Sequence, residues 1–307
     1  MKYIIGVDIG GTSIKIGLFN EDLTLLNKYT LPTVVKDNGE QIVLDIISKI
    51  KKIIDTEGLT SSNLLGIGLG IPGPVKDNYV HKCANINWNE INIKDKFQDD
   101  FKNANIRSAN DANTAALGET LFTNKNYENV VLVTLGTGIG GGIITNKKIN
   151  EGANGFGGEI GHIPIDEKYN FECGCGNFGC AETLGSAKGI SRLIDYHLNE
   201  KTSTTISRKS KAKDLFDAAK INDQFALEIV NIYTKCLAKL SVIIALTLDP
   251  DVIVFGGGIS NAGEFLIDAI KEQYIELMPF VQMKTLKFQL AKLGNDAGIY
   301  GAAYLVK

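Results

Sequence analysis

The sequence has little net charge and no long apolar run, and each of these absences excludes a class of protein. Its 32 Lys and Arg residues nearly balance its 35 Asp and Glu residues, so the chain offers no overall field that would hold nucleic acid or an anionic membrane surface. Its most apolar stretches, at 130–135 and 242–248, are far shorter than the ~20 apolar residues that span a bilayer. We therefore expect no nucleic-acid partner and no membrane anchor.

A disulfide framework and a secretion signal are also missing from the pattern. The chain has five cysteines, an odd count, and three of them fall within 173–180, which suits a metal site in a reducing compartment better than a set of disulfides. The N-terminal segment has no long apolar region followed by a small-residue cleavage site. These features predict a cytoplasmic protein in which Cys83 and Cys236 are ordinary buried thiols.

Glycine is the residue type present in excess, at 33 of 307 residues, against a usual share of about 7%. Hydrophobic residues at 44% and charged residues at 22% are close to globular averages, so the chain is neither disordered nor membranous as a whole. A chain of this length can form about two domains with a sizeable core. The glycines gather at turns between apolar segments, where we expect functional sites.

Apolar periodicity predicts alternating strands and helices. Strands at 3–9 and 14–20 flank the turn Gly10-Gly11-Thr12 and form a hairpin. Isoleucines at helical spacing between Ile42 and Ile54 predict a helix that ends near Gly58. The other expected elements are strands at 64–70, 142–145 and 251–255, helices at 113–122, 214–219, 224–247 and 264–277, and a solvated loop at 201–213. This alternation is typical of an α/β fold.

The chain also contains an internal repeat of domain size. The segment IIGVDIGGTSIKIGL at 4–18 parallels VVLVTLGTGIGGGII at 130–144 without gaps, each with an apolar strand, a turn of small residues and a second strand. Self-similarity at this interval indicates two related domains and not a solenoid of short repeats. We place the boundary between them within 110–128.

Two stretches match the dinucleotide-binding pattern G-x-G-x-x-G by letter, at Gly68 to Gly73 and at Gly136 to Gly141. That pattern needs a helix directly after it, so that the helix N-terminus meets a pyrophosphate. Proline and strand-like sequence follow here, and the P-loop pattern is absent, so neither motif is expected. Glycine turns between two strands can still hold phosphate, because their successive N–H groups form an anion-binding concavity. The alternative is a pair of ordinary tight hairpins.

Seven motifs in order resemble the ROK family of bacterial sugar kinases and sugar-responsive repressors, and they cover nearly the whole chain: GVDIGGTSIKIGL, GLGIPGPV, NDANTAALGE, VTLGTGIGGGII, GGEIGHIPI, CGCGNFGCAE and DVIVFGGGIS. The resemblance implies an actin-like ATPase fold of the sugar kinase and ribonuclease H-like type, with two duplicated α/β domains around a cleft and the last helix packed on the first domain. We expect a small domain of residues 1–117 plus about 293–307, and a larger domain of residues 118–292 that carries the zinc loop.

The resemblance implies a kinase that transfers phosphate from ATP, and it assigns the catalytic base to Asp111. A carboxylate there would accept the proton of a sugar hydroxyl. The preceding Asn110, together with Gly73, is expected to contact the sugar. From the residues alone, Asn110 or Asp111 could equally be a simple helix N-cap.

The same resemblance implies a nucleotide site. Asp8 is expected to hold Mg²⁺ on the nucleotide through water, because magnesium keeps several waters and needs only one or two carboxylates. Gly257 is expected near adenosine. Lys15 could be a phosphate partner or an exposed strand residue, and it is left outside the expected site. The residues expected to cradle phosphate are Gly10, Gly11, Thr12, Gly136, Thr137 and Gly138.

The cysteine cluster has the composition of a structural zinc site. Cys173, Cys175 and Cys180 supply three thiolates, and His162 upstream supplies an imidazole for a tetrahedral site. Family resemblance makes this metal zinc and places Glu159, His162 and Glu182 against the sugar, so that His162 serves both through its two ring nitrogens. Surface charge is the alternative for each glutamate.

The expected function is phosphorylation of glucose to glucose 6-phosphate by a homodimer or a dimer of dimers. Another ROK kinase, for N-acetylmannosamine, fructose, mannose or allose, is the nearest alternative, followed by a non-catalytic sugar sensor. The repressor branch carries a DNA-binding domain before the first glycine turn, whereas the first strand begins here by Tyr3. Gly157 and Ala181 stand where many family members have other residues, which weakens inferences about the preferred sugar.

Overall fold

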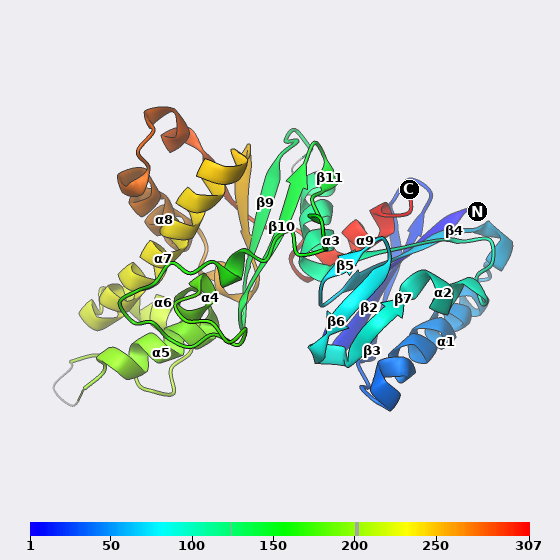
Figure 1. Cartoon of the computed structure of the whole chain (residues 1–307), viewed down its shortest axis with the longest axis horizontal. Helices are drawn as coiled ribbons and strands as arrows, with labels where there is room; N and C mark the ends of the chain where they lie inside the picture. Colours follow the sequence, from blue (N-terminus) through cyan, green and yellow to red (C-terminus); the bar gives the residue numbers. More distant parts are fainter. Residues whose placement is uncertain (124, 200–202) are drawn as a thin grey trace. The chain divides into compact units, whose positions relative to one another are not determined.

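The computed structural model describes residues 1–123, 125–199 and 203–307, which form two compact units. The first unit comprises Met1–Glu128, Gly142–Gly158 and Asn295–Lys307, and the second comprises Asn129–Gly141 and Glu159–Gly294. Both chain termini therefore belong to the first unit (Figure 1).

The first sheet has the strand order β3-β2-β1-β4-β8. β1 pairs antiparallel with β2 and parallel with β4, and β4 pairs parallel with β8. Its strands are β1 (Tyr3–Ile9), β2 (Ser13–Asn20), β3 (Leu25–Pro32), β4 (Leu64–Ile71) and β8 (Asn105–Asn110). A small second layer holds β5 (Val75–Lys76), β6 (Tyr79–Cys83) and β7 (Trp88–Asn92). The predicted hairpin at the N-terminus is confirmed.

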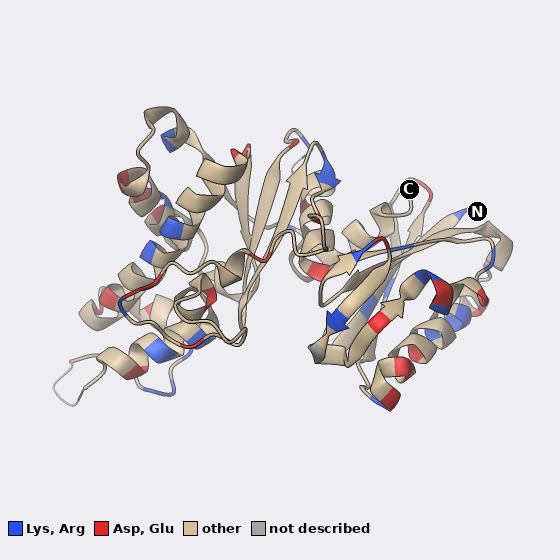
Figure 2. Ribbon diagram, viewed as in Figure 1, with Lys and Arg blue, Asp and Glu red and all other residues tan. Residues whose placement is uncertain are grey.

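The helices of the first unit are α1 (Glu40–Thr56), α2 (Ile93–Gln98), α3 (Asp111–Gly118) and α9 (Ala297–Tyr304). The isoleucines of α1 are buried in one core with β1, as their helical spacing predicts. Basic and acidic residues are interspersed along this helix (Figure 2), which fits the small net charge of the chain. The predicted helix at 113–122 begins earlier, at Asp111, and gives way to a π-helical turn at Glu119–Thr123.

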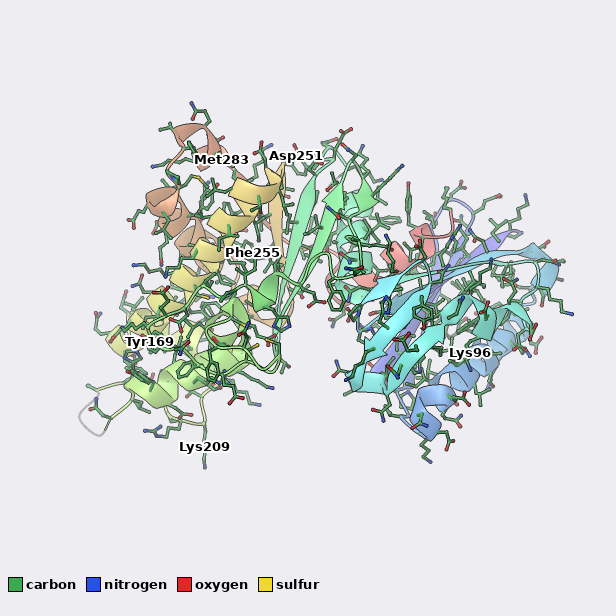
Figure 3. All side chains as sticks on the ribbon, viewed as in Figure 1. Lys96, Tyr169, Lys209, Asp251, Phe255 and Met283 are labelled. Carbon is green, nitrogen blue, oxygen red and sulfur yellow. The ribbon has the colours of Figure 1, made fainter. Side chains whose placement is uncertain are left out.

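The second sheet has the order β11-β10-β9-β12-β13. Its strands are β9 (Val130–Leu135), β10 (Ile139–Thr145), β11 (Lys148–Ile149), β12 (Val252–Gly256) and β13 (Lys287–Leu290), and its helices are α4 (Ala181–Gly185), α5 (Ala187–His197), α6 (Ala212–Lys220), α7 (Gln224–Leu248) and α8 (Glu264–Leu277). Phe255 of β12, labelled in Figure 3, stacks on Phe288 of β13 with ring centroids 6.0 Å apart. Tyr274 of α8 meets Phe288 edge-on at 5.0 Å, so this helix and the sheet share an aromatic core.

The two sheets confirm the internal repeat. In each, the first strand of the repeat lies at the centre, beside its hairpin partner on one side and a parallel strand on the other. β1 and β9 are the two central strands, and each is followed by a short glycine turn. Two copies of one α/β unit therefore account for the matching sequence segments.

The domain division differs from the one expected at residues 118–292. Residues 118–128 and 142–158 group with the first unit, because long-range contacts tie them to it. Asn113 Nδ2 donates to the carbonyl oxygen of Gly157 at 3.2 Å, and the Lys76 ammonium lies 3.2 Å from the Glu151 carboxylate. A sequence repeat marks where an element begins, but it carries no information on such contacts.

The last helix packs on the first unit, as the family resemblance implies, and glycines make the close approach feasible. A Cβ atom on Gly68 of β4 would lie 1.7 Å from the carbonyl oxygen of Ala302 in α9. A Cβ atom on Gly301 of α9 would lie 1.7 Å from the carbonyl oxygen of Thr114 in α3. Backbone therefore meets backbone at both contacts, and any larger residue would force the elements apart.

Among the described residues, one helix, α7, meets a test for being long and apolar enough to cross a membrane. This helix of 25 residues passes that test by length and composition. However, 61% of its most apolar window is buried inside the protein, and it packs beside α8 (Figure 1). Its apolar residues therefore serve the core of the second unit. Of the loop expected at 201–213, residues 201 and 202 lie outside the described residues, and α6 begins at Ala212.

Candidate active site

Three parallel strands end at one edge of the first sheet and bring several predicted residues there. Asp8 of β1 pairs in register with Gly70 of β4, and Ile71 of β4 pairs with Asn110 of β8. Asp111 follows β8 directly, as the first residue of α3. The carboxyl ends of parallel strands are the usual location of ligand sites in α/β sheets. Asp8, the predicted magnesium residue, and Asp111, the predicted base, therefore both lie at a typical site edge.

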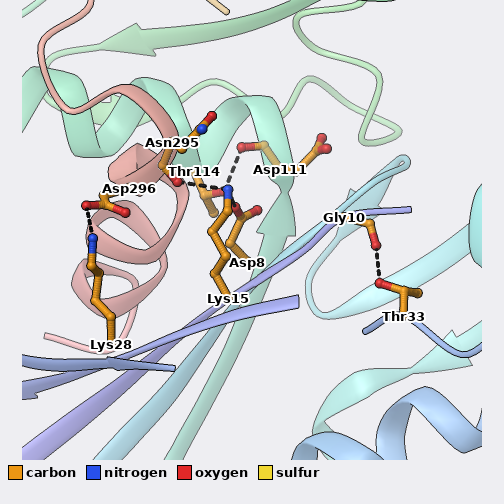
Figure 4. A network of polar contacts seen from close by, with 9 residues as sticks. All are labelled: Asp8, Gly10, Lys15, Lys28, Thr33, Asp111, Thr114, Asn295 and Asp296. Atoms are coloured by element: carbon orange, nitrogen blue, oxygen red, sulfur yellow. Dashed lines mark hydrogen bonds and ion pairs between the residues drawn. The ribbon is translucent and has the colours of Figure 1, made fainter. Parts of the chain in front are cut away.

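The first glycine turn links β1 and β2 beside Asp8. The Gly10 N–H donates to the Ser13 carbonyl at 3.0 Å, and the Thr33 hydroxyl donates to the Gly10 carbonyl at 2.6 Å (Figure 4). Gly11 and Thr12 are exposed, and no described atom lies within 4 Å of the position that a Cβ on Gly11 would take. The protein's own packing therefore does not require glycine at position 11.

Asp8 forms an ion pair with Lys15, whose role the sequence did not determine. The Lys15 ammonium lies 3.4 Å from the Asp8 carboxylate and donates to the Asn295 carbonyl at 2.9 Å (Figure 4). The side chains are 19% and 32% exposed for Asp8 and Lys15 respectively, so this ion pair is shielded from water. Burial raises the pKa of Asp8 above its ordinary value, and the Lys15 ammonium offsets part of the rise.

The Lys15→Met variant is expected to move the acid limb of the kcat/KM profile to higher pH. Without the ammonium, burial raises the Asp8 pKa further, so the carboxylate that a metal needs is lost at a higher pH. Initial rates measured across the pH range at saturating sugar check this shift. Lys28→Met is the control, because Lys28 pairs with Asp296 at 2.7 Å and not with Asp8. An acid limb that stays in place in Lys15→Met would exclude the pairing from catalysis.

The structure shows which of Asn110 and Asp111 caps helix α3. Asn110 is the N-cap of α3, since its Oδ1 accepts from the Asn113 N–H at 3.1 Å. Its Nδ2 donates to the Gly73 carbonyl at 3.1 Å, which joins two of the predicted sugar contacts to one another. Asp111 uses Oδ1 to accept from the Ala112 N–H at 2.8 Å. The helix cap therefore rests on Asn110, and Asp111 is not needed for it.

The second glycine turn links β9 and β10 in the second unit. The Gly136 N–H donates to the Gly138 carbonyl at 3.0 Å, and the Ala187 N–H donates to the Gly136 carbonyl at 2.9 Å. Thr137 is exposed at its tip. Gly257 lies next to the end of β9, where its φ of 84° and a gap of only 2.4 Å between a Cβ atom and the Leu135 carbonyl both require glycine.

The predicted metal ligands lie together. One ligand atom from each of four side chains falls within 4.8 Å of all the others: His162, Cys173, Cys175 and Cys180. The Cys175 and Cys180 sulfurs are 3.8 Å apart, and His162 Nδ1 lies 3.5 Å from the Cys173 sulfur. Zinc bonds of about 2.3 Å to sulfur and 2.0–2.1 Å to nitrogen give tetrahedral edges of about 3.8 and 3.6 Å. The types of donor atom and these two distances therefore fit a tetrahedral zinc site.

The thiols of this cluster have unequal pKa values. Burial and the neighbouring thiols raise the pKa of Cys180 to about 12, and a hydrogen bond from the Asn177 backbone lowers the pKa of Cys175. A metal ion must displace the thiol protons to bind, so its affinity falls with falling pH.

The second nitrogen of His162 faces a different group. His162 Nε2 lies 3.8 Å from the Glu159 carboxylate, while Nδ1 faces the cysteines. The two ring nitrogens therefore face different groups. Glu182 Oε2 accepts from the Ile139 N–H at 3.1 Å, and Oε1 lies 3.5 Å from the Cys173 sulfur. Glu182 therefore contacts the second glycine turn, which the sequence did not predict.

Each unit thus collects its own share of the predicted residues. The first unit holds Asp8, Gly10, Gly11, Thr12, Gly73, Asn110 and Asp111, whereas the second holds Gly136, Thr137, Gly138, Glu159, His162, the three clustered cysteines, Glu182 and Gly257. Sequence patterns missed the contact of Lys15 with Asn295, because 280 positions separate the two residues.

Comparisons with known proteins identify the family of this chain. A profile of the ROK family matches residues 4–307. A glucokinase of Halalkalibacterium halodurans is 37% identical, over 100% of this chain and 95% of the relative. An N-acetyl-D-glucosamine kinase of Haemophilus influenzae is 31% identical, over 98% of both chains. The crystal structure of a ROK family glucokinase from Streptomyces griseus, in complex with glucose and AMPPNP, matches with a TM-score of 0.76 at 29% identity, over 99% of this chain and 98% of that one.

The family match covers nearly the whole chain, and the fold agrees over the same length with a member of known structure. The duplicated sheets and the α/β topology expected from the sequence are those of the actin-like ATPase fold. The chain therefore belongs to the ROK family.

Proposed function

We propose that this protein is an ATP-dependent hexose kinase whose substrate is glucose and whose product is glucose 6-phosphate. The observation that carries the proposal is the common edge at which β1, β4 and β8 end. It gathers a glycine turn, Asp8 and Asp111, which are the groups that phosphoryl transfer needs for phosphate binding, metal binding and hydroxyl activation. Membership of the ROK family and the glucokinases among its relatives support glucose.

In this proposal Asp111 accepts the proton of the attacking hydroxyl and orients its oxygen toward the γ-phosphate. Phosphoryl transfer passes through a loose transition state, so an ordinary carboxylate suffices as the base. Asp8 would hold Mg²⁺ through water, and the metal would supply charge neutralisation for the phosphates. The backbone N–H groups of the two turns cradle the phosphates, at Gly10, Gly11, Thr12, Gly136, Thr137 and Gly138, and Gly257 lies near adenosine.

The sugar is held by polar groups of the protein. Carboxylates suit vicinal hydroxyls because each can accept two hydrogen bonds at once. The proposed contacts are Gly73, Asn110, Asp111, Glu159, His162 and Glu182. Zinc bound by His162 and the three cysteines would fix the loop that carries Glu159 and Glu182, and four ligand atoms within 4.8 Å of one another support this site.

The choice of glucose as the substrate is tested by comparing the activity of the protein on several sugars. ADP release is measured with glucose, N-acetylglucosamine, N-acetylmannosamine, mannose, fructose and allose, and we expect the highest kcat/KM with glucose. The N-acetyl-D-glucosamine kinase among the relatives makes the amino sugars the sharpest comparison. A kcat/KM far higher for an amino sugar would overturn the choice of glucose and leave the kinase assignment in place. No ADP release with any sugar would overturn the kinase assignment.

The Gly11→Ala variant tests the first turn as a phosphate site. No described atom lies within 4 Å of the added methyl group, so the free energy of unfolding should stay within about 0.5 kcal/mol of wild type. The methyl group occupies the space that a phosphate oxygen would need, so the Kd for ATP should rise at least ~10-fold. Isothermal titration with ATP and urea unfolding measure the two quantities. Unchanged ATP affinity would remove Gly11 from the site.

We also propose that the protein is a cytoplasmic homodimer. The family resemblance supports the dimer, and the clustered unpaired cysteines suit a reducing compartment. Sedimentation velocity over a range of protein concentrations measures the assembly, and a monomer at all of them would contradict it.

A further inference from the structure

The second glycine turn is tied at both ends to one segment of the chain. The Gly136 carbonyl accepts from the Ala187 N–H at 2.9 Å, where α5 begins. The Ile139 N–H, on the other side of the turn, donates to Glu182 Oε2 at 3.1 Å. Glu182 and Ala187 are close in sequence and lie in the consecutive helices α4 and α5. The conformation of the turn therefore depends on this segment.

The Glu182 carboxylate also lies directly against the backbone of the turn. A Cβ atom on Gly138 would be 2.0 Å from Glu182 Oε2, which is far inside van der Waals contact. Gly138 has no φ in the left-handed region, so its backbone conformation does not demand glycine. A side chain at position 138 would therefore displace the Glu182 carboxylate from the turn.

Glu182 is held in place from its other side by the cysteine cluster. It lies in the first turn of α4, two residues after the N-cap residue Cys180. Its Oε1 lies 3.5 Å from the Cys173 sulfur, and the Thr183 hydroxyl donates to the Cys180 carbonyl at 2.7 Å. One side chain thus spans the distance from the cluster to the turn.

We propose that Glu182 is a positioning residue for the nucleotide, which holds the β9–β10 turn in its phosphate-binding conformation through the Ile139 N–H. This inference rests on the proposed function, because it assumes that the turn binds nucleotide phosphates. It assigns Glu182 a role distinct from a sugar contact. The hydrogen bond uses a charged acceptor, the strong class among such bonds, and its loss leaves the turn free to change shape.

The two roles of Glu182 are separated by measuring each ligand alone. ADP and glucose are titrated separately into the full-length protein and into three variants, Glu182→Ala, Glu182→Gln and Glu159→Ala. In Glu182→Ala we expect the Kd for ADP to rise about 10-fold, the effect of losing a hydrogen bond to a charged group. Glu182→Gln keeps an acceptor for the Ile139 N–H and should bind ADP within about threefold of wild type, because the geometry survives without the charge.

Glu159→Ala is the matched control. Glu159 is a carboxylate of the same unit that contacts His162 and not the turn. Its loss should therefore weaken the binding of glucose and leave the Kd for ADP unchanged. An unchanged Kd for ADP in Glu182→Ala, with weaker binding of glucose, would overturn the proposal and leave Glu182 as a sugar contact only.

Amide hydrogen exchange tests the positioning role of Glu182 independently of the proposed function. The Ile139 amide should exchange faster in Glu182→Ala than in wild type and Glu182→Gln, without any ligand. If wild type binds no ADP, the proposed function fails. If wild type binds ADP and Ile139 exchange is the same in all variants, the positioning role fails and the proposed function stands.

Discussion

Replacing Asp111 with asparagine is expected to lower kcat by roughly 10²–10⁴-fold, the range that a positioned general base contributes. The amide retains an oxygen that can accept the Ala112 N–H, so the local geometry of α3 is preserved while the proton acceptor is lost. Asn110 carries the helix cap, and the free energy of unfolding should therefore change by less than about 1 kcal/mol. Single-turnover rates and urea unfolding of the same preparation measure both effects.

Asp214→Asn is the matched control for this experiment. Asp214 also lies in the first turn of a helix, α6, and accepts the Lys211 N–H at 2.8 Å, but it belongs to the other unit and to no proposed site. Its kcat should match that of wild type. If Asp111→Asn turned over substrate at a near-normal rate, another group would have to be the base.

Helices and strands that are bounded by glycine or proline were predictable from the sequence. The helix expected at 264–277 agrees with α8, because Gly263 at a φ of 78° precedes it and Pro279 follows closely. The first hairpin was equally clear, since alternating apolar residues flank a glycine turn. The helix expected at 113–122 was less accurate, because its C-terminal part becomes a π-helical turn for which the sequence carries no recognised signal.

Features that depend on distant residues were not predictable. The two carboxylates of the site came from family motifs, but the partner of Lys15 lies 280 positions away. The contact of Glu182 with Ile139 spans 43 positions and depends on how α4 packs beside the turn. The helix expected at 224–247 agrees with α7, but counting uninterrupted apolar stretches understated its apolar length, because Lys235 and Lys239 interrupt them. Sequence patterns therefore located the site and omitted its internal support.

Replacing Cys180 with serine is expected to abolish zinc binding and to destabilise the second unit. Loss of an outer-shell partner alone costs roughly 10–100-fold in metal affinity, so loss of a direct ligand should cost at least ~100-fold. Cys180 is fully buried and directly precedes α4, the helix that carries Glu182. Without the bond from Cys180 to the metal, the start of this helix is no longer fixed. Sugar affinity should fall together with the melting temperature. Metal analysis by mass spectrometry, thermal unfolding and glucose titration follow the three effects.

The Cys83→Ser variant separates the metal from the general cost of replacing a buried thiol. Cys83 is buried in the first unit, outside the cluster, so its serine variant should lose some stability and keep one zinc ion per chain. A chelator added to wild type should reproduce the lower melting temperature of Cys180→Ser, because structural zinc contributes its binding free energy to folding. The chelator should have no effect on Cys180→Ser itself. Wild-type protein that is purified under reducing conditions and contains no zinc would contradict the metal site, and the stability loss in Cys180→Ser would then have to come from packing alone.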